Sequence, residues 1–416
     1  MNKNFLKVVF SELVRIGTAP LRVLPIKNNR ILFTGLTGGK SYDYSCNPKY
    51  LYEYLRDNYP GRYEYVWAVK DKAQYSFLEE EGVKLIKHFT VSSFPMLLTS
   101  KIVVTNGSYA PWFPFRKKQY VINTWHGGGA YKKVENEAPG KDWATRKRAQ
   151  FCADNIDLFL ASCKVQEEQM IRTTYQYQGE VLRAGTPRND GLLKGDAKAV
   201  AAKVRTYYNI PENGRIVMYA PTYRTPSTPV ELDVDVLLDK LNLLGVETLK
   251  QLLEFSMDSD ESTFHQPDEN GIKWYFFNRY HRYQDDNMNV KVKGQAVIDV
   301  MDYPDMQELL CATDLLITDY SSCVWDYMLL QKPCFLYVPD KEEYIEQTGF
   351  YVGLDEWPFE QANTVDTLME CVENYDSEKA KIRIEEHLKR LGSYEQGECC
   401  GQIAKRIEQE SEKMNE

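Results

Sequence analysis

The sequence predicts an α/β protein built from two doubly wound domains. Its 416 residues, 43% of them hydrophobic, are enough for two domains of about 200 residues, each with its own core. From residue 30 onward, short apolar runs alternate with amphipathic stretches, which is the pattern of parallel strands connected by helices. We expect an N-terminal segment over 1–29, a first domain over 30–195, a second over 196–390 and a helical tail over 391–416.

The N-terminal segment is amphipathic and basic. Residues 1–30 contain six Lys/Arg and a single acid, Glu12, and apolar side chains form a broad surface between Phe5 and Ile16. This pattern predicts a helix that lies on an anionic membrane surface, although a helix packed on its own domain explains it equally well. Glu12 and Arg15 interrupt the apolar region, which disfavours a secretory signal, and no apolar run of about 18 residues could span a bilayer.

Six strands are predicted in the first domain. A helix over 47–55 follows the first strand, with Asn47 as its N-cap and Pro48 at its first position. The loop over 35–39 is Gly-rich but lacks the G-x-G-x-x-G spacing, so it indicates a sharp turn. The predicted strands cover 30–35, 63–69, 83–86, 101–108, a run that starts at Tyr120, and 157–161.

His126 lies just past the carboxyl end of the strand that starts at Tyr120, where open α/β sheets place their ligands. It stands between Trp125 and three glycines that begin at Gly127, so a substrate could approach it closely. The position favours a functional role for His126 and Gly127 over the alternative, a histidine in a surface loop.

A crowded turn closes the first domain. Gly185, Pro187, Asn189 and Asp190 are typical turn residues, and Arg188 carries a planar fork that suits phosphate or carboxylate. We therefore expect Arg188 and Asn189 to bind substrate.

The stretch from residue 116 to residue 148 is locally basic. It contains nine Lys/Arg and three acids, against a net charge of -9 for the whole chain. Such a region could hold a phosphate-rich acceptor or lie against lipid headgroups; a solvated helix face is the competing explanation.

The second domain offers two strand ends with polar side chains. Pro221 terminates the strand that begins at Arg215, which leaves Thr222 and Arg224 at its crevice end. An aromatic strand over 273–281 delivers Arg279 and His281, although a lone histidine in that position is more often structural. Other predicted elements are helices over 234–254 and 306–313 and from 378 onward, strands over 297–301, 315–318 and 333–338, and a mobile loop over 258–270.

The turn over 319–322 connects the strand over 315–318 to a helix that starts near Cys323. Free backbone N–H groups and the positive end of the helix dipole lie there, and Ser321 and Ser322 add two hydroxyl donors. The turn therefore suits a phosphate, the alternative being that one serine is merely an N-cap.

Charge and composition limit the kinds of site that the protein can have. The net charge of -9 argues against a general nucleic-acid binder. The nine cysteines are scattered without a C-x-x-C pair, which indicates reduced thiols in a cytosolic setting. No clear acidic cluster for a metal is present.

Five motifs, taken together, resemble the CDP-glycerol glycerophosphotransferase family of bacterial teichoic-acid and capsule enzymes. They occur in the family's order and span roughly residues 30–390. The motifs are Thr-Trp-His-Gly at 124–127, Gly-Thr-Pro-Arg-Asn-Asp at 185–190, Tyr-Ala-Pro-Thr-Tyr-Arg at 219–224, Thr-Asp-Tyr-Ser-Ser at 318–322 with Asp326 and Tyr327, and Tyr-Val-Pro-Asp-Lys-Glu-Glu-Tyr at 337–344.

The resemblance implies a GT-B arrangement of two Rossmann-like domains with a cleft between them, the first for the acceptor and the second for a CDP-alditol. An acceptor hydroxyl would attack the β-phosphate of CDP-glycerol and release CMP, with no cofactor and no metal. The acceptor would be linked to a lipid or polysaccharide, and the enzyme would lie peripherally on the cytoplasmic face of the cell membrane.

The resemblance also implies residue roles. His126 would be the general base, and His281 with Arg279 would contact the diphosphate that Ser321 and Ser322 cradle. The remaining substrate-binding residues would be Gly127, Arg188, Asn189, Thr222, Arg224, Asp319 and Asp326.

This chain departs from the family pattern in two places. The family often has a basic residue followed by His-Pro where this chain has Asn278-Arg-Tyr-His-Arg282 after a long insertion. Gly129 and Ala130 replace bulkier residues after Trp-His-Gly, which leaves the acceptor open. The alternatives are CDP-ribitol as donor, a GT-B nucleotide-sugar glycosyltransferase, and a non-catalytic GT-B-like binding protein.

Overall fold

The computed structural model describes residues 10, 13–35, 44–87, 90–107, 113–134, 137, 143–222, 230, 232–253, 272–280 and 296–413. These residues form two compact units, each of which is described by itself. Unit 1 comprises Met1–Asp190 and Gly392–Glu416, and unit 2 comprises Gly191–Leu391. The predicted site residues Arg224 and His281 and the predicted loop over 258–270 lie outside the described residues.

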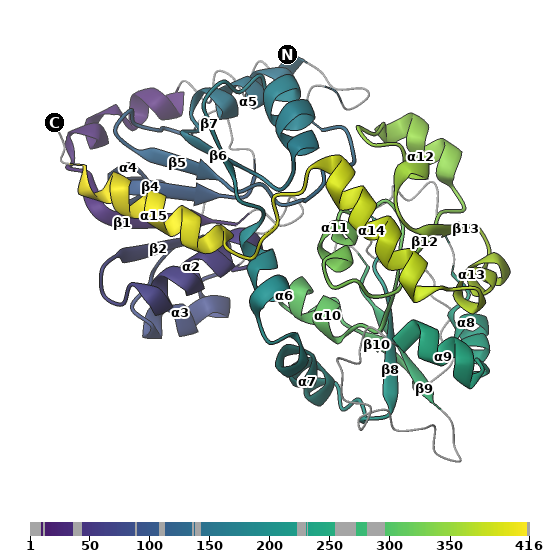
Figure 1. Ribbon diagram of the computed structural model, residues 1–416. Helices are drawn as coiled ribbons and strands as arrows, with labels where there is room; N and C mark the ends of the chain where they lie inside the picture. Colours follow the sequence, from purple (N-terminus) through teal and green to yellow (C-terminus); the bar gives the residue numbers. More distant parts are fainter. Residues whose placement is uncertain are drawn as a thin grey trace. The chain divides into compact units, whose positions relative to one another are not determined.

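Unit 1 contains a parallel sheet of seven strands in the order β3-β2-β1-β4-β5-β6-β7 (Figure 1). Its central strands read as continuous apolar runs because both faces of a parallel sheet are covered. The strands are β1 (Lys27–Thr34), β2 (Glu64–Val69), β3 (Lys84–Lys87), β4 (Ser100–Thr105), β5 (Tyr120–Asn123), β6 (Leu158–Ala161) and β7 (Glu180–Arg183).

The helical elements of unit 1 connect these strands. The first, η1 (Ala19–Val23), packs against α4. A nine-residue π-helix, η5, follows β6, and such helices are rare and often occur at functional sites. The remaining bounds are α2 (Cys46–Asn58), η2 (Ala73–Tyr75), α3 (Ser76–Glu80), η3 (Val91–Ser93), α4 (Phe94–Thr99), α5 (Trp143–Asp154), η5 (Gln166–Thr174), η6 (Pro187–Asn189) and α15 (Cys399–Glu412).

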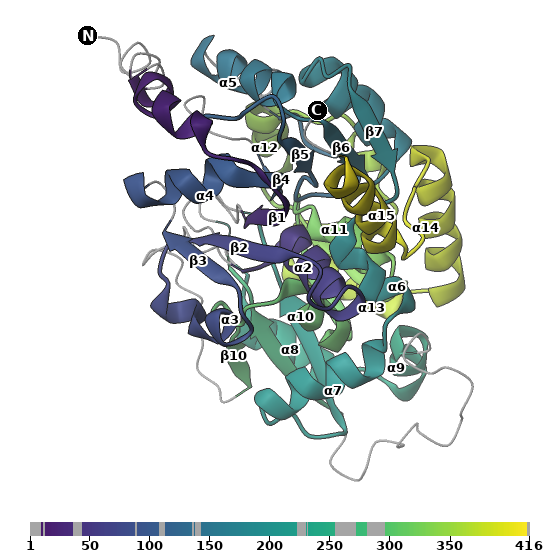
Figure 2. The same cartoon turned by 90° about the vertical axis from the view of Figure 1, so that its left-hand side faces the viewer.

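The core of unit 1 includes residues from the far end of the chain. Helix α15 lies beside α2 and packs on the sheet, as both Figure 1 and Figure 2 show. Ile403 and Ile407 are fully buried there against β1 residues such as Ile31 and Phe33. Each buried side chain of this size contributes about 1.5–3 kcal/mol, so α15 is an integral part of unit 1.

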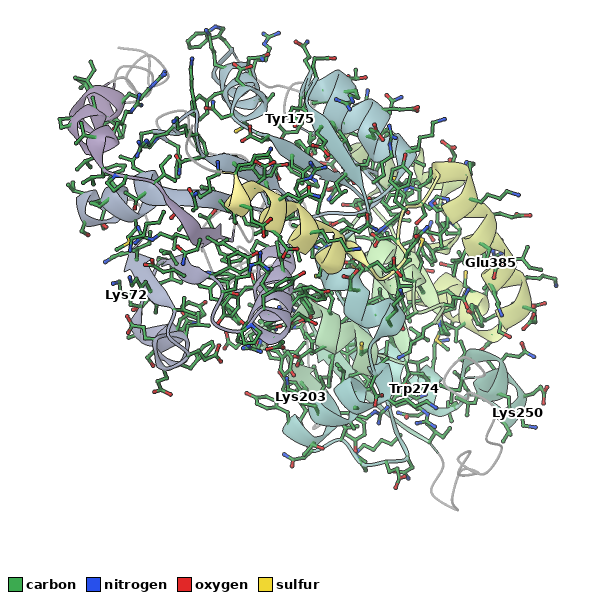
Figure 3. The ribbon with its side chains drawn as sticks, turned by 60° about the vertical axis from the view of Figure 1, so that its left-hand side comes forward. Lys72, Tyr175, Lys203, Lys250, Trp274 and Glu385 are labelled. Carbon is green, nitrogen blue, oxygen red and sulfur yellow. The ribbon has the colours of Figure 1, made fainter. Side chains whose placement is uncertain are left out.

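Unit 2 contains a parallel sheet of six strands in the order β10-β9-β8-β11-β12-β13. Trp274, labelled in Figure 3, is fully buried on β9 in the core of this unit. The strands are β8 (Gly214–Tyr219), β9 (Lys273–Asn278), β10 (Val297–Asp299), β11 (Leu315–Thr318), β12 (Cys334–Tyr337) and β13 (Glu360–Ala362).

Aspartate caps begin several helices of unit 2. Asp196 accepts from Ala199 N at α7, Asp233 from Val236 N at α8, and Asp305 from two amides at α10. The bounds are α6 (Asp190–Lys194, which begins in unit 1), α7 (Ala197–Tyr207), α8 (Val234–Asn242), α9 (Val246–Leu253), α10 (Met306–Ala312), α11 (Cys323–Met328), α12 (Lys341–Thr348), η9 (Leu354–Glu356), α13 (Val365–Glu373) and α14 (Ser377–Leu391).

Both sheets reverse their strand order once. In unit 1 the chain runs outward from β1 through β2 to β3 and then returns to β4 on the other side, so the reversal lies between β1 and β4. In unit 2 the corresponding reversal lies between β8 and β11. Ligands of open α/β sheets bind beyond the carboxyl ends of the strands at such a point, so each unit has one expected ligand position.

Two sequence-based predictions of helices were wrong. The predicted helix over 234–254 is two helices, because the chain turns at Leu243–Gly245 and exposes Leu243. The N-cap of α2 is Ser45 rather than Asn47, whose side chain is buried inside the protein. Within the described residues, no helix has the length and apolar character needed to cross a membrane.

Candidate active site

His126 follows β5 beside the reversal point of the unit 1 sheet. Its side chain is exposed, and its Nδ1 lies 2.7 Å from the carbonyl oxygen of Asn106, the residue that follows β4. A carbonyl oxygen only accepts hydrogen bonds, so Nδ1 must carry the proton in this contact. The neutral imidazole then has its lone pair on Nε2, which is the arrangement of a general base.

The turn that carries His126 has a strained backbone and is packed by aromatic rings. Trp125 has a φ of +53°, in the left-handed region that bulky residues avoid, at a typical cost of about 1–3 kcal/mol. Its buried ring lies 4.5 Å from the His126 ring, centroid to centroid. The rings of Trp125 and Tyr175, which is labelled in Figure 3, make a T-shaped contact with centroids 5.8 Å apart, and Asn123 Oδ1 accepts from Trp125 N at 2.8 Å.

Two side chains hold the backbone around His126. Arg188 Nη1 donates to the His126 carbonyl at 2.6 Å, and Gln166 Nε2 donates to the Gly127 carbonyl at 3.0 Å. Gln166 is the first residue of the π-helix, and its Oε1 accepts from Ser162. The predicted residues His126, Gly127 and Arg188 therefore lie together, while Gln166 had no local signal in the sequence.

The turn over 185–190 joins unit 1 to its own C-terminal segment. Glu395 accepts from Thr186 and, at 3.1 Å, from Asn189 Nδ2, and the φ of Gly185 is +84° where a Cβ would strike Glu395. Asp190 accepts from Cys399 N at 2.9 Å and Cys400 N at 2.7 Å, which caps α15.

Arg188 and Asn189 are both buried in this turn. The side-chain contacts of Arg188 and Asn189 described above are with other parts of the protein, so substrate binding by these two residues stays a prediction.

In unit 2, Thr222 and Asp319 meet at the reversal point between β8 and β11. Asp319 is fully buried, and its two oxygens accept from Thr222 N at 2.8 and 3.0 Å. Thr318 Oγ1 donates to the Ala220 carbonyl at 2.7 Å, which fixes the same two strand ends. Asp319 thereby holds the backbone at Thr222, two residues before Arg224.

The turn over 319–322 leads into α11 without a side-chain cap from Ser322. Ser321 Oγ accepts a long hydrogen bond, 3.4 Å, from Cys323 N. Both serines are half-buried, and burial raises the pKa of the Cys323 thiol beneath them to about 11, so this thiol stays neutral. Ser321 is therefore at most a weak N-cap, and the Ser322 side chain does not cap the helix.

Aromatic stacking stabilises this turn. Tyr320 stacks on Tyr344 with ring centroids 3.9 Å apart and 10° between the planes, and its hydroxyl donates to Asp340 at 2.9 Å. Tyr344 was not among the predicted site residues. It is the last residue of the motif over 337–344, so this motif could have indicated its contact with the turn.

Two further predicted site residues of unit 2 make hydrogen bonds to other parts of the same unit. Arg279 Nη1 donates to the carbonyls of Val300 and, at 2.6 Å, Met301. Asp326 is buried, and its Oδ2 accepts from Gln307 Nε2 at 3.0 Å. Their predicted contacts with substrate stay predictions. In the described part of the chain, no group of three His, Cys, Asp or Glu side chains could hold a metal ion.

The fold and the two sites define a GT-B-like protein made of two parallel α/β units. A solved structure of the wall teichoic acid polymerase TagF superimposes with a TM-score of 0.74 at 22% identity, over 98% of this chain and 97% of that one. The expected fold class is confirmed by this similarity.

The family follows from the sequence match. The model of the family described as CDP-Glycerol:Poly(glycerophosphate) glycerophosphotransferase matches residues 18–409, and the chain belongs to this family.

The relatives differ in the alditol that their names give. A teichoic acid poly(glycerol phosphate) polymerase of Bacillus spizizenii is 26% identical over 98% of this chain and all of its own length. A teichoic acid ribitol-phosphate primase of the same organism is 23% identical over 96% of this chain and 95% of its own. Some relatives are longer: the chain spans 46% of the Bacillus subtilis poly(glycerol phosphate) polymerase, at 27% identity.

Proposed function

We propose that this protein transfers glycerol phosphate from CDP-glycerol to a hydroxyl of a membrane- or polymer-linked acceptor in teichoic acid or capsule biosynthesis. The acceptor binds on unit 1, and the CDP-alditol binds on unit 2. The observation that carries the proposal is the contact between His126 Nδ1 and the Asn106 carbonyl, because it leaves the basic lone pair on Nε2.

The reaction needs one proton transfer and one displacement. His126 Nε2 takes the proton of the acceptor hydroxyl, whose oxygen forms a bond to the β-phosphorus of the donor. The bond from that phosphorus to the bridging oxygen breaks, and CMP leaves with the electron pair. The product is a phosphodiester, and the protonated imidazole returns its proton to solvent.

Unit 2 supplies donors for the diphosphate in this proposal. The half-buried hydroxyls of Ser321 and Ser322 stand at the turn before α11, and Asp319 holds the neighbouring Thr222 backbone. Arg279 and His281 would contact the diphosphate, and Arg224 would bind the substrate beside them. Fixed donors of this kind stabilise the charge that develops on phosphoryl oxygens.

In this proposal the enzyme lies at the cytoplasmic membrane surface, and the exposed side chains of the N-terminal segment support that location. Leu13, Ile16 and Val23 are 61%, 69% and 85% exposed, and Arg22 lies among them. Exposed apolar side chains next to basic ones suit the headgroup region of an anionic bilayer.

CDP-ribitol is the second candidate donor, because a ribitol-phosphate primase is among the relatives. Glycerol and ribitol differ by a few hydroxyl groups, whose discrimination depends on single hydrogen bonds in the donor site.

The test is CMP release by the purified protein from CDP-glycerol, CDP-ribitol and a UDP-sugar, each with and without a lipid-linked acceptor. We expect CMP from one CDP-alditol, a loss of at least about 100-fold in His126→Ala, and full turnover in the exposed control Gln178→Ala. Full turnover by His126→Ala would exclude His126 as the general base. UMP or UDP release would identify a nucleotide-sugar enzyme, and donor binding without turnover would indicate a binding protein.

A further inference from the structure

Asn47 makes three hydrogen bonds in the interior of unit 1. It is the second residue of α2 and is fully buried. Its Nδ2 donates to the Trp125 carbonyl at 2.8 Å and to the Thr124 carbonyl at 3.2 Å. Its Oδ1 accepts from the backbone N–H of Arg188 at 3.3 Å. The side chain thus connects α2, the His126 turn and the turn over 185–190.

The chemistry of the partners determines how the Asn47 amide is oriented. The carbonyls of Thr124 and Trp125 only accept hydrogen bonds, and the Arg188 N–H only donates. Rotating the amide by 180° would bring Oδ1 against two carbonyl oxygens and Nδ2 against an N–H. Asn47 therefore acts as a double donor toward the His126 turn.

These two donor contacts fix the strained residue of the turn. The peptide group that ends in the Thr124 carbonyl precedes Trp125, and the one that contains the Trp125 carbonyl follows it. Holding both groups fixes φ and ψ of Trp125, whose φ of +53° persists only where its surroundings impose it. The second of these peptide groups also contains the backbone nitrogen of His126.

The next carbonyl along the chain is held through the same residue. Asn47 Oδ1 accepts from Arg188 N, and Arg188 Nη1 donates to the His126 carbonyl. Both peptide groups that flank His126 are therefore tied, directly or through Arg188, to one buried amide.

We infer that Asn47 is a positioning residue for His126: it holds the backbone on which the imidazole reaches the Asn106 carbonyl and presents Nε2. Asn47 itself contacts neither imidazole nitrogen, so it acts through the backbone. Its effect on turnover rests on the proposed function, whereas its effect on the imidazole does not.

The first arm of the test is spectroscopic. Asn47→Asp keeps the shape of the side chain but removes both donor hydrogens, and Asn47→Ser is a second, uncharged variant. The matched control is Asn58→Asp on the same helix, where the exposed Asn58 donates to the Tyr54 carbonyl at 2.9 Å. The chain has five histidines, so ¹³C-histidine labelling with His126→Ala as reference assigns the His126 signal.

We expect both Asn47 variants to shift or broaden the His126 signal, while Asn58→Asp leaves it in place. An unchanged His126 signal in a folded Asn47 variant would overturn the inference, whatever the protein catalyses.

The second arm is a double-mutant cycle on CMP release. We expect Asn47→Ser to lower kcat about 10- to 100-fold, because a misplaced base costs rate, with the donor KM within about twofold. In a His126→Ala background the same change should cost nothing further if the effect of Asn47 on turnover is exerted through that imidazole. An equal loss in both backgrounds would show a general structural role instead. If the parent protein releases no CMP, the proposed function fails and the spectroscopic arm alone decides.

Discussion

Thr222 and Asp319 are 97 residues apart in the sequence, and a bifurcated hydrogen bond joins the Thr222 amide to both oxygens of the buried Asp319 carboxylate. The contact ties the end of β8 to the end of β11 where the unit 2 sheet reverses. Burial removes the water that would otherwise hydrogen-bond to this carboxylate, so its hydrogen bonds within the protein matter for stability.

Asp319→Asn should destabilise unit 2. The amide has one acceptor oxygen in place of two and loses the charge, and hydrogen bonds to charged groups contribute about 1.5–3 kcal/mol. We expect urea denaturation to show a loss of this size in the free energy of unfolding. The exposed Asp302→Asn is the control and should change it by less than about 0.5 kcal/mol. Equal stability of the Asp319 variant and the parent would contradict the assigned role.

Asp190→Ala should loosen α15. Asp190 caps this helix by accepting from Cys399 N and Cys400 N, and loss of such a cap costs about 0.5–2 kcal/mol. Hydrogen exchange should become faster in α15 and stay unchanged in α7. The reciprocal control is Asp196→Ala, which removes the cap of α7 and should reverse this pattern. Faster exchange in both helices with either variant would indicate global destabilisation.

Ser321→Ala and Ser322→Ala should each weaken the binding of CDP-glycerol. A hydroxyl that donates to a phosphate oxygen contributes about 0.5–1.5 kcal/mol, which corresponds to a two- to tenfold change in Kd for each serine. Isothermal titration calorimetry measures this directly, and the exposed Ser92→Ala in unit 1 is the control. Unchanged affinity in the double variant would remove the phosphate-binding role of the turn.

Acid should destabilise unit 2 through His387. Burial, reinforced by the Arg390 guanidinium, lowers the pKa of His387 to about 4 from its ordinary 6.5. The unfolded chain therefore binds the proton more readily, so this stability is present above pH 6.5 and is lost as the pH falls toward 4.

We expect a loss of about 2–3 kcal/mol between pH 7.5 and pH 4.5 in the free energy of unfolding that His387→Gln does not show. Glutamine keeps an acceptor for Arg390, which contacts His387 Nδ1 at 3.0 Å. His126→Gln, at an exposed position, should retain the acid sensitivity of the parent. Parallel pH profiles of the free energy of unfolding for the parent and His387→Gln would exclude His387 as the cause of the acid sensitivity.

The exposed apolar side chains of the N-terminal segment should contribute to membrane binding. We expect Leu13→Gln/Ile16→Gln to reduce cosedimentation with anionic vesicles, since burying each of these side chains contributes about 1.5–3 kcal/mol. The control is Ile382→Gln on α14, which is 52% exposed and has no part in the proposed surface. Equal sedimentation of all three proteins would argue against a membrane role for this segment.

The sequence predicted the sheets well because buried parallel strands are apolar runs that can be recognised locally. It predicted the place of His126 for the same reason, since a Gly-rich turn after a strand is a local pattern. The edge strand β7, the three-residue strand β13 and the break at Gly245 have weak local signals, and all three were missed.

The supports of the site could not be predicted because they are contacts between distant parts of the chain. Asn47 resembles a helix cap in sequence, yet its partners are 77, 78 and 141 residues away. Gln166 lies 39 residues from the Gly127 carbonyl that it holds. Only the packing of helices onto the sheet brings such residues together.

The composition of unit 1 has a consequence for biosynthesis. Its sheet is made from the first part of the chain, but α15 and Glu395, which complete its core and its 185–190 turn, belong to Gly392–Glu416. On the ribosome these residues emerge after all of unit 2, so the nascent unit 1 waits with an apolar surface uncovered while unit 2 is translated. Domains usually fold in order during synthesis, but here the unit that is begun first is finished last.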